Sequence, residues 1–207
     1  MGDFMNIILN TNKLGYTPFL DTHINSFIIG FKNFCINQEY TLSLKELPRA
    51  INEIKGKNKK IYLSINIFAS EKDILKFKKI INKLKILNID GFIVSDLGIL
   101  NLFKENNLIN KVILDLQTYT TNKYSAKSLL DLGVKRVSLS KEITLEDIEE
   151  ISIFNNGNIE VLCQGYNAIT HSKRPILSCY YKNLNLNKKN NIHYIKEESR
   201  ENYYFLQ

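Results

Sequence analysis

The stretch Gly91-Phe92-Ile93-Val94-Ser95-Asp96-Leu97-Gly98-Ile99-Leu100 decides the fold, because it joins a strand directly to a helix. The run Gly91–Ser95 is continuously apolar up to its last residue, as expected of a parallel strand buried on both faces. Asp96 follows at once and can cap a helix over Leu97–Glu105, since its carboxylate can accept from the free N–H groups of the first turn. A strand followed by a capped helix is typical of a βαβ unit.

The same alternation runs along most of the chain. Helices are predicted by start signals such as a Ser or Thr followed three residues later by an acidic residue. The expected strands are Asn6–Leu9, Ser26–Phe31, Ile61–Ile67, Gly91–Ser95, Val112–Leu116, Arg136–Leu139 and Ile159–Cys163. The other expected helices are Leu47–Ile54 after Ser43 and Glu46, Glu71–Leu87 after Ser70, Lys123–Leu132 after Asn122, and Leu145–Ile153 after Thr144 and Asp147.

This pattern predicts an α/β fold, a TIM-barrel-like (β/α) barrel in residues 1–181. Neither GxGxxG nor GxxxxGK[ST] follows a strand, which argues against dinucleotide and P-loop sites. A complete eight-unit barrel needs more chain, so the barrel is compact, incomplete, or completed by residues after Ser178. Residues 182–207 form a polar loop and a tail with two expected strands, Ile192–Lys196 and Tyr203–Leu206. The apolar end of this tail indicates a truncated form of a longer protein.

Composition narrows the class of protein. The 207 residues are 44% apolar, enough for one globular core, and no apolar run approaches the roughly 20 residues of a membrane span. The first residues lack a signal-peptide pattern, which favours the cytoplasm. The net charge of +7 favours acidic partners such as RNA, although a solvated lysine-rich surface explains it as well. Three widely spaced cysteines give neither a disulfide framework nor a zinc motif.

Polar residues at the carboxyl ends of the expected strands should share one face of the barrel. Asp96 and Glu142 are the carboxylates in this ring, but Asp96 is equally explained as a helix cap, and Glu142 can pair with Lys141 or face solvent. Gln117 has no capping explanation and is the better candidate. The ring also includes Asn33, Cys35, Asn66, Thr118, Ser140 and Gln164.

A polar segment after the last strand adds further candidates. Residues 164–180 directly follow an apolar run and are rich in Gln, Asn, Thr, His, Ser, Lys and Arg. Ser172 is one of the candidates in this segment. Arg174 stands out because the chain uses Lys almost everywhere else. It suits bidentate recognition of a carboxylate or phosphate, with a structural ion pair as the equal alternative.

Four segments resemble the collagenase-like peptidase family U-32. Gly91–Leu100 is similar to that family's "DGiivsDlgvl", and Leu116-Gln117-Thr118 with Asn122 is similar to "stQ…tN". Leu132–Glu142 resembles "lGvkRvvLsrEls". Gln164-Gly165, Ser172-Lys173-Arg174 and Ser178 resemble "HG…C…YSgRCllSny", and the likeness runs in order from about Phe27 to Tyr181.

The resemblance implies a TIM-barrel-like catalytic domain. Despite the peptidase name, relatives act in oxygen-independent hydroxylation of a tRNA uridine, a ribosomal cytidine or ubiquinone precursors, and some use prephenate as the hydroxyl source. Several hold a 4Fe-4S cluster on four cysteines. The positions that match the family site are Asp96, Gln117, Asn122, Glu142 and Arg174.

The chain departs from the family signature at its cluster ligands. The signature cysteines fall at Ala168 and Pro175, and the signature histidine falls at Gln164. Cys35 lies near a position that some relatives use as a ligand, and Cys179 lies four residues past another. The cofactor therefore stays open, with a non-cysteine ligand or a cluster shared between subunits as alternatives.

Three functions follow as hypotheses. In a hydroxylase acting on RNA or a small aromatic, Asp96 or Glu142 is the acid/base, and Gln117 orients the substrate with Asn122. Asn66, Gln164 and Ser172 add substrate contacts, and Arg174 clamps an anionic group. A protease, acting on a peptide, follows the family name at face value. The third is a non-catalytic barrel without the cluster that binds RNA or a paralogous subunit.

Overall fold

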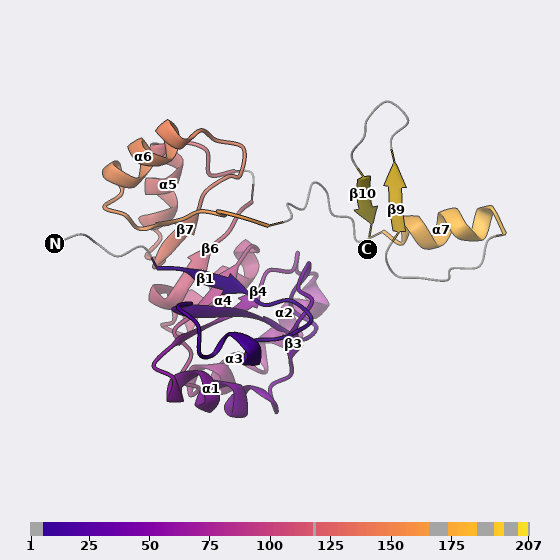
Figure 1. Cartoon of the computed structure of the whole chain (residues 1–207), viewed down its shortest axis with the longest axis horizontal. Coiled ribbons are helices and arrows are strands. Elements are labelled where there is room, and N and C mark those ends of the chain that lie inside the picture. The colour runs from indigo at the N-terminus through magenta and orange to yellow at the C-terminus, as the bar shows by residue number, and fades with distance from the viewer. Residues whose placement is uncertain (1–5, 118, 166–173, 186–192, 197–202, 207) are drawn as a thin grey trace. The chain divides into compact units, whose positions relative to one another are not determined.

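The structure is a computed structural model that describes residues 6–117, 119–165, 174–185, 193–196 and 203–206 (Figure 1). The chain divides into two compact units, Met1–Tyr166 and Asn167–Gln207, and each is described by itself. No helix in the described part of the chain is long and apolar enough to cross a membrane.

The first unit is built on one parallel sheet of eight strands. Seven of them lie in chain order, β1-β2-β4-β5-β6-β7-β8, and the short β3 pairs with β2. Among the described residues the path ends at β1 and at β8, so the curled sheet forms a half-barrel. The expectation of a TIM-barrel-like α/β fold is confirmed, and of its three forms the incomplete barrel is the one observed.

The observed strands lie where the apolar runs predicted them, but most end earlier. In these strands the apolar run continues past the last strand residue into the following loop. β3 was not predicted. The strands are β1 Ile8–Asn10, β2 Ser26–Phe31, β3 Thr41–Leu42, β4 Lys60–Ile65, β5 Gly91–Val94, β6 Val112–Leu114, β7 Arg136–Ser138 and β8 Ile159–Glu160.

Side-chain caps start most of the helices as predicted. Ser70 and Thr144 each form a complete capping box with the acidic residue three positions on, and Asp96 and Asn122 each accept from the third residue of their helix. The helices of this unit are α1 Leu47–Gly56, α2 Glu71–Lys78, α3 Ile81–Lys85, α4 Leu97–Glu105, α5 Lys123–Leu130 and α6 Leu145–Phe154, with 3₁₀ turns η1 Thr17–Phe19 and η2 Ile109–Lys111.

The prediction of one long helix over Glu71–Leu87 is wrong. The chain forms α2 and α3 instead, with a tight turn at Lys79–Ile80. There the amides bond three residues back, Lys79 to the Lys76 carbonyl (3.2 Å) and Ile80 to the Phe77 carbonyl (2.9 Å). Phe77 in α2 and Ile81 in α3 are both buried, so the turn lets both short helices pack on the sheet.

The sheet has two different faces. The outer face carries the main core, in which strand residues such as Phe92 and Leu63 pack against α1 to α4. Phe92, Phe103 and Phe77 form a chain of ring contacts, with centroids 4.8 and 5.7 Å apart. The concave face has a small separate apolar cluster of Ile28, Tyr62, Ile93 and Ile113, with Ile8 packed against it.

The second unit contains α7 Ile176–Asn183 and an antiparallel pair, β9 His193–Lys196 and β10 Tyr203–Leu206. The two tail strands were predicted, and they form a sheet of their own. The helix α7 was not predicted, because it follows a polar segment that is typical of a loop. The predicted domain ranges, 1–181 and 182–207, stay a prediction.

Candidate functional site

A row of polar residues crosses the concave face at the carboxyl ends of the strands. Ser138 pairs directly with Glu160, and cross-strand partners in a sheet share a face. Asp115 and Ser95 lie two residues after Ile113 and Ile93 of the concave cluster, so strand alternation places them on the same face. The Asp115 amide bonds the Val94 carbonyl (2.9 Å), which continues the pairing to this level. Asn66 extends the row beyond β4, two residues after Ser64.

Arg136 lies on the same face as this row, two residues before Ser138 in β7. It pairs with Ile113, so its side chain belongs to the concave face. The guanidinium carbon lies 5.5 Å from the centre of the Tyr62 ring, and Nη2 lies 3.6 Å from Glu160 Oε2. Both side chains are less than one-fifth exposed, so this ion pair is largely withdrawn from water. At 3.6 Å the two atoms attract without forming a hydrogen bond.

Glu160 is the carboxyl best suited to proton transfer in this row. Burial raises the pKa of Glu160, the nearby Asp115 carboxylate raises it further, and Arg136 partly opposes both effects. A carboxyl with a raised pKa keeps its proton closer to neutral pH, as a general acid or base requires. Perturbed groups in a concave site are functional candidates on physical grounds.

Several polar atoms of the concave face are buried without a hydrogen-bond partner among the described residues. They are Ser64 Oγ, Ser95 Oγ, Glu160 Oε2, and Nε and Nη2 of Arg136. Buried polar atoms are normally paired, because an unpaired one forfeits about 1–3 kcal/mol. The concave face therefore has hydrogen-bonding capacity that the described residues leave unused, although Arg136 and Glu160 attract each other as an ion pair.

Asp96 lies beside this row and is directed to the opposite side. Its Oδ1 accepts from the Ile99 amide and its Oδ2 accepts from the Ala69 amide, both at 3.0 Å. The carboxylate thus caps α4 and ties it to the loop after β4. Asn122 similarly caps α5 by accepting from the Ser125 amide at 2.9 Å. The geometry gives both residues a structural role, and their predicted roles in the site stay untested.

Gln117 and Asn66 do lie at the carboxyl edge of the sheet. Gln117 has a left-handed backbone (φ 59°), and its amide donates to Asp115 Oδ1 at 2.9 Å, so a tight turn places it just past the row. Asn66 Oδ1 accepts from the Ile36 amide at 2.9 Å, which leaves its amide nitrogen for other partners. Glu142 is exposed in the turn before α6.

The remaining predicted residues lie at or beyond the end of the first unit. Gln164 is exposed after β8, and Arg174 is exposed just before α7 in the second unit. Ser172 and Ala168 lie outside the described residues. The predictions for Gln164, Ser172 and Arg174 therefore stay predictions.

Sequence reasoning missed the residues that define the row, namely Ser95, Asp115, Arg136, Ser138 and Glu160. A signal was present, because Asp115 and Glu160 are carboxylates that each interrupt an otherwise apolar run predicted to form a strand. Arg136 is also an arginine in a lysine-rich chain, and the same feature makes Arg174 a candidate.

The cysteines do not fit a 4Fe-4S cluster. Such a cluster is typically held by four thiolates, whereas the chain has three cysteines, and Pro175 falls where the resemblance to the family places a signature cysteine. Burial raises the pKa of Cys35 to about 11, which disfavours the thiolate that would bind iron. Its Sγ is packed so closely on β2 that a Cβ added at Gly30 would lie 2.7 Å from it. Across the described ranges no three His, Cys, Asp or Glu residues gather as a metal site.

Comparison with known proteins gives a consistent result. The sequence model of peptidase family U32 matches residues 16–202. An uncharacterized protease of Methanocaldococcus jannaschii is 37% identical over 107 residues, which are 52% of this chain and 26% of that protein. The tRNA hydroxylation protein P of Escherichia coli is 30% identical over 137 residues, 66% of this chain and 30% of its own length. The chain thus spans well under half the length of these relatives.

A solved structure of a U32 peptidase has a similar fold. It superposes with a TM-score of 0.55 over 78% of this chain and 68% of its own, at 13% sequence identity. At that identity the likeness concerns the fold alone, and it agrees with the curled parallel sheet.

Proposed function

Because this chain belongs to peptidase family U32, we propose that it acts in oxygen-independent hydroxylation of an RNA pyrimidine, with a tRNA uridine as the first candidate. The observation that carries the proposal is the row of buried polar atoms without hydrogen bonds around the Arg136–Glu160 ion pair on the concave face. The similarity to a tRNA hydroxylation protein supports RNA as the substrate, and so does the net charge of +7. Such a role would place the protein in the cytoplasm.

The concave residues match the proton-handling part of this chemistry. Replacing a ring C–H by C–OH removes one proton and two electrons, and a hydroxyl-donating co-substrate must supply the oxygen and take up the electrons. Glu160 can accept the ring proton, and Arg136 stabilises the carboxylate before the transfer. Ser95, Asp115 and Ser138 can hydrogen-bond the polar edge of the pyrimidine, while Gln117 and Asn66 line the rim.

Mass spectrometry of tRNA and rRNA nucleosides from cells with and without this gene tests the proposal. Deletion should remove a hydroxylated pyrimidine, and the wild-type gene should restore it. Glu160→Gln should fail to restore it because the amide cannot take up the proton. Glu150→Gln is the matched control, since Glu150 is an exposed carboxylate on α6 and should leave the modification intact. An unchanged nucleoside profile on deletion would contradict the proposal.

A non-catalytic barrel that binds RNA or a paralogous subunit is the second candidate. The observation that favours it is the mismatch between the three cysteines and the four that a cluster needs. In that case the modification would depend on a cysteine-complete partner, and Glu160→Gln would leave the nucleoside profile unchanged. A protease function rests only on the family name and on the name of the Methanocaldococcus jannaschii relative.

A further inference from the structure

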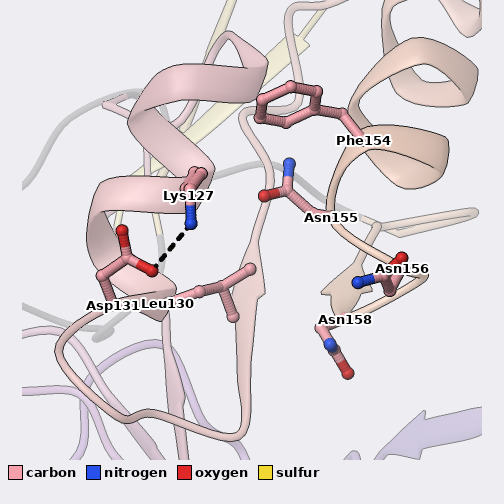
Figure 2. Close-up of a pocket in the computed structure, with 7 residues that line it drawn as sticks. All are labelled: Lys127, Leu130, Asp131, Phe154, Asn155, Asn156 and Asn158. Atoms are coloured by element: carbon pink, nitrogen blue, oxygen red, sulfur yellow. Dashed lines mark hydrogen bonds and ion pairs between the residues drawn. The ribbon is translucent and has the colours of Figure 1, made fainter.

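A cavity of about 280 Å³ lies between the C-terminal ends of α5 and α6, away from the concave face (Figure 2). Phe154 forms one side, Leu130 with the Lys127–Asp131 ion pair forms another, and the loop from α6 to β8 closes the third. This loop precedes β8, so the cavity lies toward the amino edge of the sheet, whereas the row lies at the carboxyl edge.

The aromatic side of the cavity is partly open. Phe154 is 42% exposed although it is a large apolar residue at the end of a helix. Tyr124 contacts it edge to face, with ring centroids 5.5 Å apart, and the Lys123 ammonium lies 5.6 Å from both ring centres. These contacts hold the Phe154 ring in place, and Figure 2 shows the ring at the margin of the cavity. A fixed and accessible ring is a stacking platform for a flat ligand.

Three asparagines line the cavity on the side of the loop that follows α6. Asn155 is buried, and its nitrogen donates to the carbonyls of Ile151 (2.9 Å) and Lys123 (3.3 Å). This fixes the amide orientation and leaves Oδ1 as an acceptor on the cavity side (Figure 2). Asn156 has a left-handed backbone (φ 54°) and Gly157 follows with φ 70°, so a tight turn brings Asn158 to the same cavity.

We propose that this cavity binds one unstacked nucleobase of RNA, with Phe154 stacking on the base and the amides of Asn155, Asn156 and Asn158 reading its edge. An amide offers both a donor and an acceptor, which matches the mixed edge of a base. The volume suits a single base with part of its ribose. Lys127 lines the cavity, and although it pairs with Asp131, its ammonium group has further N–H donors for a backbone phosphate. This site is distinct from the concave row, and base binding there does not require hydroxylation.

The test is an NMR titration of the ¹⁵N-labelled full chain with each of the four nucleoside 5′-monophosphates. Saturable shifts are expected in the side-chain amides of Asn155, Asn156 and Asn158. Phe154→Ala should weaken binding by about 5- to 150-fold, the range for one base–aromatic stack. Ile153→Ala is the matched control, because Ile153 is 74% exposed on the same helix and does not line the cavity. Asn158→Ala provides a second variant in case Phe154→Ala perturbs α6.

Each outcome decides the proposal. No saturable shift at millimolar nucleotide would overturn it, and so would equal affinity in Phe154→Ala and the wild type. If N-acetylarginine amide shifts these asparagine resonances saturably and the nucleotides do not, the cavity binds a basic protein segment instead, and the proposal is overturned. Glu160→Gln should keep full nucleotide binding here, so failure of the hydroxylation proposal and failure of this one are distinguishable.

Discussion

The two faces of the half-barrel sheet differ in how their polar groups are satisfied. On the outer side, Asp96 uses both carboxylate oxygens to bond backbone amides, within a layer where apolar side chains pack against helices. On the concave side, the buried hydroxyl of its neighbour Ser95 has no hydrogen-bond partner among the described residues. Arg136 and Glu160 attract each other as an ion pair, but Arg136 Nε and Nη2 and Glu160 Oε2 form no hydrogen bond there. The outer face therefore stabilises the fold, whereas several buried polar atoms of the concave face lack a hydrogen-bond partner among the described residues.

The largest expected effect is on the outer face. Phe103 is fully buried and contacts the rings of Phe77 and Phe92. Phe103→Ala should lower the free energy of unfolding by about 3–5 kcal/mol, because it removes a large buried side chain and leaves a cavity. Urea denaturation followed by circular dichroism measures this. A loss below about 1 kcal/mol would show that the outer core does not dominate stability.

The next effect breaks the ion pair on the concave face. Arg136→Met leaves Glu160 without its cation. At pH 8 it should lower the free energy of unfolding by an amount near the lower end of the range of about 3–5 kcal/mol. The cost should be smaller at pH 5, because a protonated Glu160 carries no charge. The raised pKa of Glu160 means that the folded state binds the proton more tightly, so its contribution to stability is present at low pH. That contribution is lost as pH rises from about 4.3, the ordinary pKa, through the folded value.

Urea unfolding at pH 5 and pH 8 checks the sign of this effect. Arg136→Met combined with Glu160→Gln serves as the control, since it has no carboxyl to titrate and should show a much smaller difference between the two pH values. An equal cost of Arg136→Met at both pH values would contradict the view that Glu160 is withdrawn from water.

A smaller effect is expected at the cap of α4. Asp96→Ala should lower the free energy of unfolding by about 0.5–2 kcal/mol, since it removes the acceptor for the Ile99 amide. Asp96→Asn should cost less because asparagine also caps helices well. If both variants keep full stability and lose RNA hydroxylation in cells, Asp96 would return as a candidate for the chemistry.

The smallest effect on stability is expected at Ser95. Removing a buried hydroxyl that has no partner among the described residues also removes its desolvation penalty, so Ser95→Ala should change stability by less than about 0.5 kcal/mol or raise it slightly. The same variant should lower the level of the modified nucleoside in the cellular assay. If Ser95→Ala keeps full modification and loses much stability, the hydroxyl stabilises the fold and has no role in the site, which would contradict the difference proposed between the two faces.

Local features of the fold were predictable from the sequence. Asp96, Asn122 and the Thr144–Asp147 box start helices as expected, because capping involves residues only three positions apart. The Ser43–Glu46 pair was confirmed in part, since Glu46 accepts from Ser43 but Ser43 does not cap the helix. The break between α2 and α3 was not predictable in this way, because it depends on how Phe77 and Ile81 pack against the sheet.

The sequence predicted a site at the carboxyl edge of the strands, and the structure places Gln117 and Asn66 at that edge. Whether this edge holds the functional site stays a prediction. Asp96 is a candidate because it directly follows a strand, yet it faces away from the row that holds Ser95, since successive side chains alternate between faces. Glu160 was overlooked inside an apolar run, although its place opposite Ser138 puts it in the row.

The sequence by itself determined the alternation of strands and capped helices, the TIM-barrel-like class of fold and the resemblance to the family, since these depend on short-range patterns. Only the tertiary structure decided which polar residues meet. Register across β6, β7 and β8 brings together Asp115, Ser138 and Glu160, and a shift of one residue would turn each side chain to the outer face. The burial that raises the pKa of Glu160 likewise arises only when distant strands surround it.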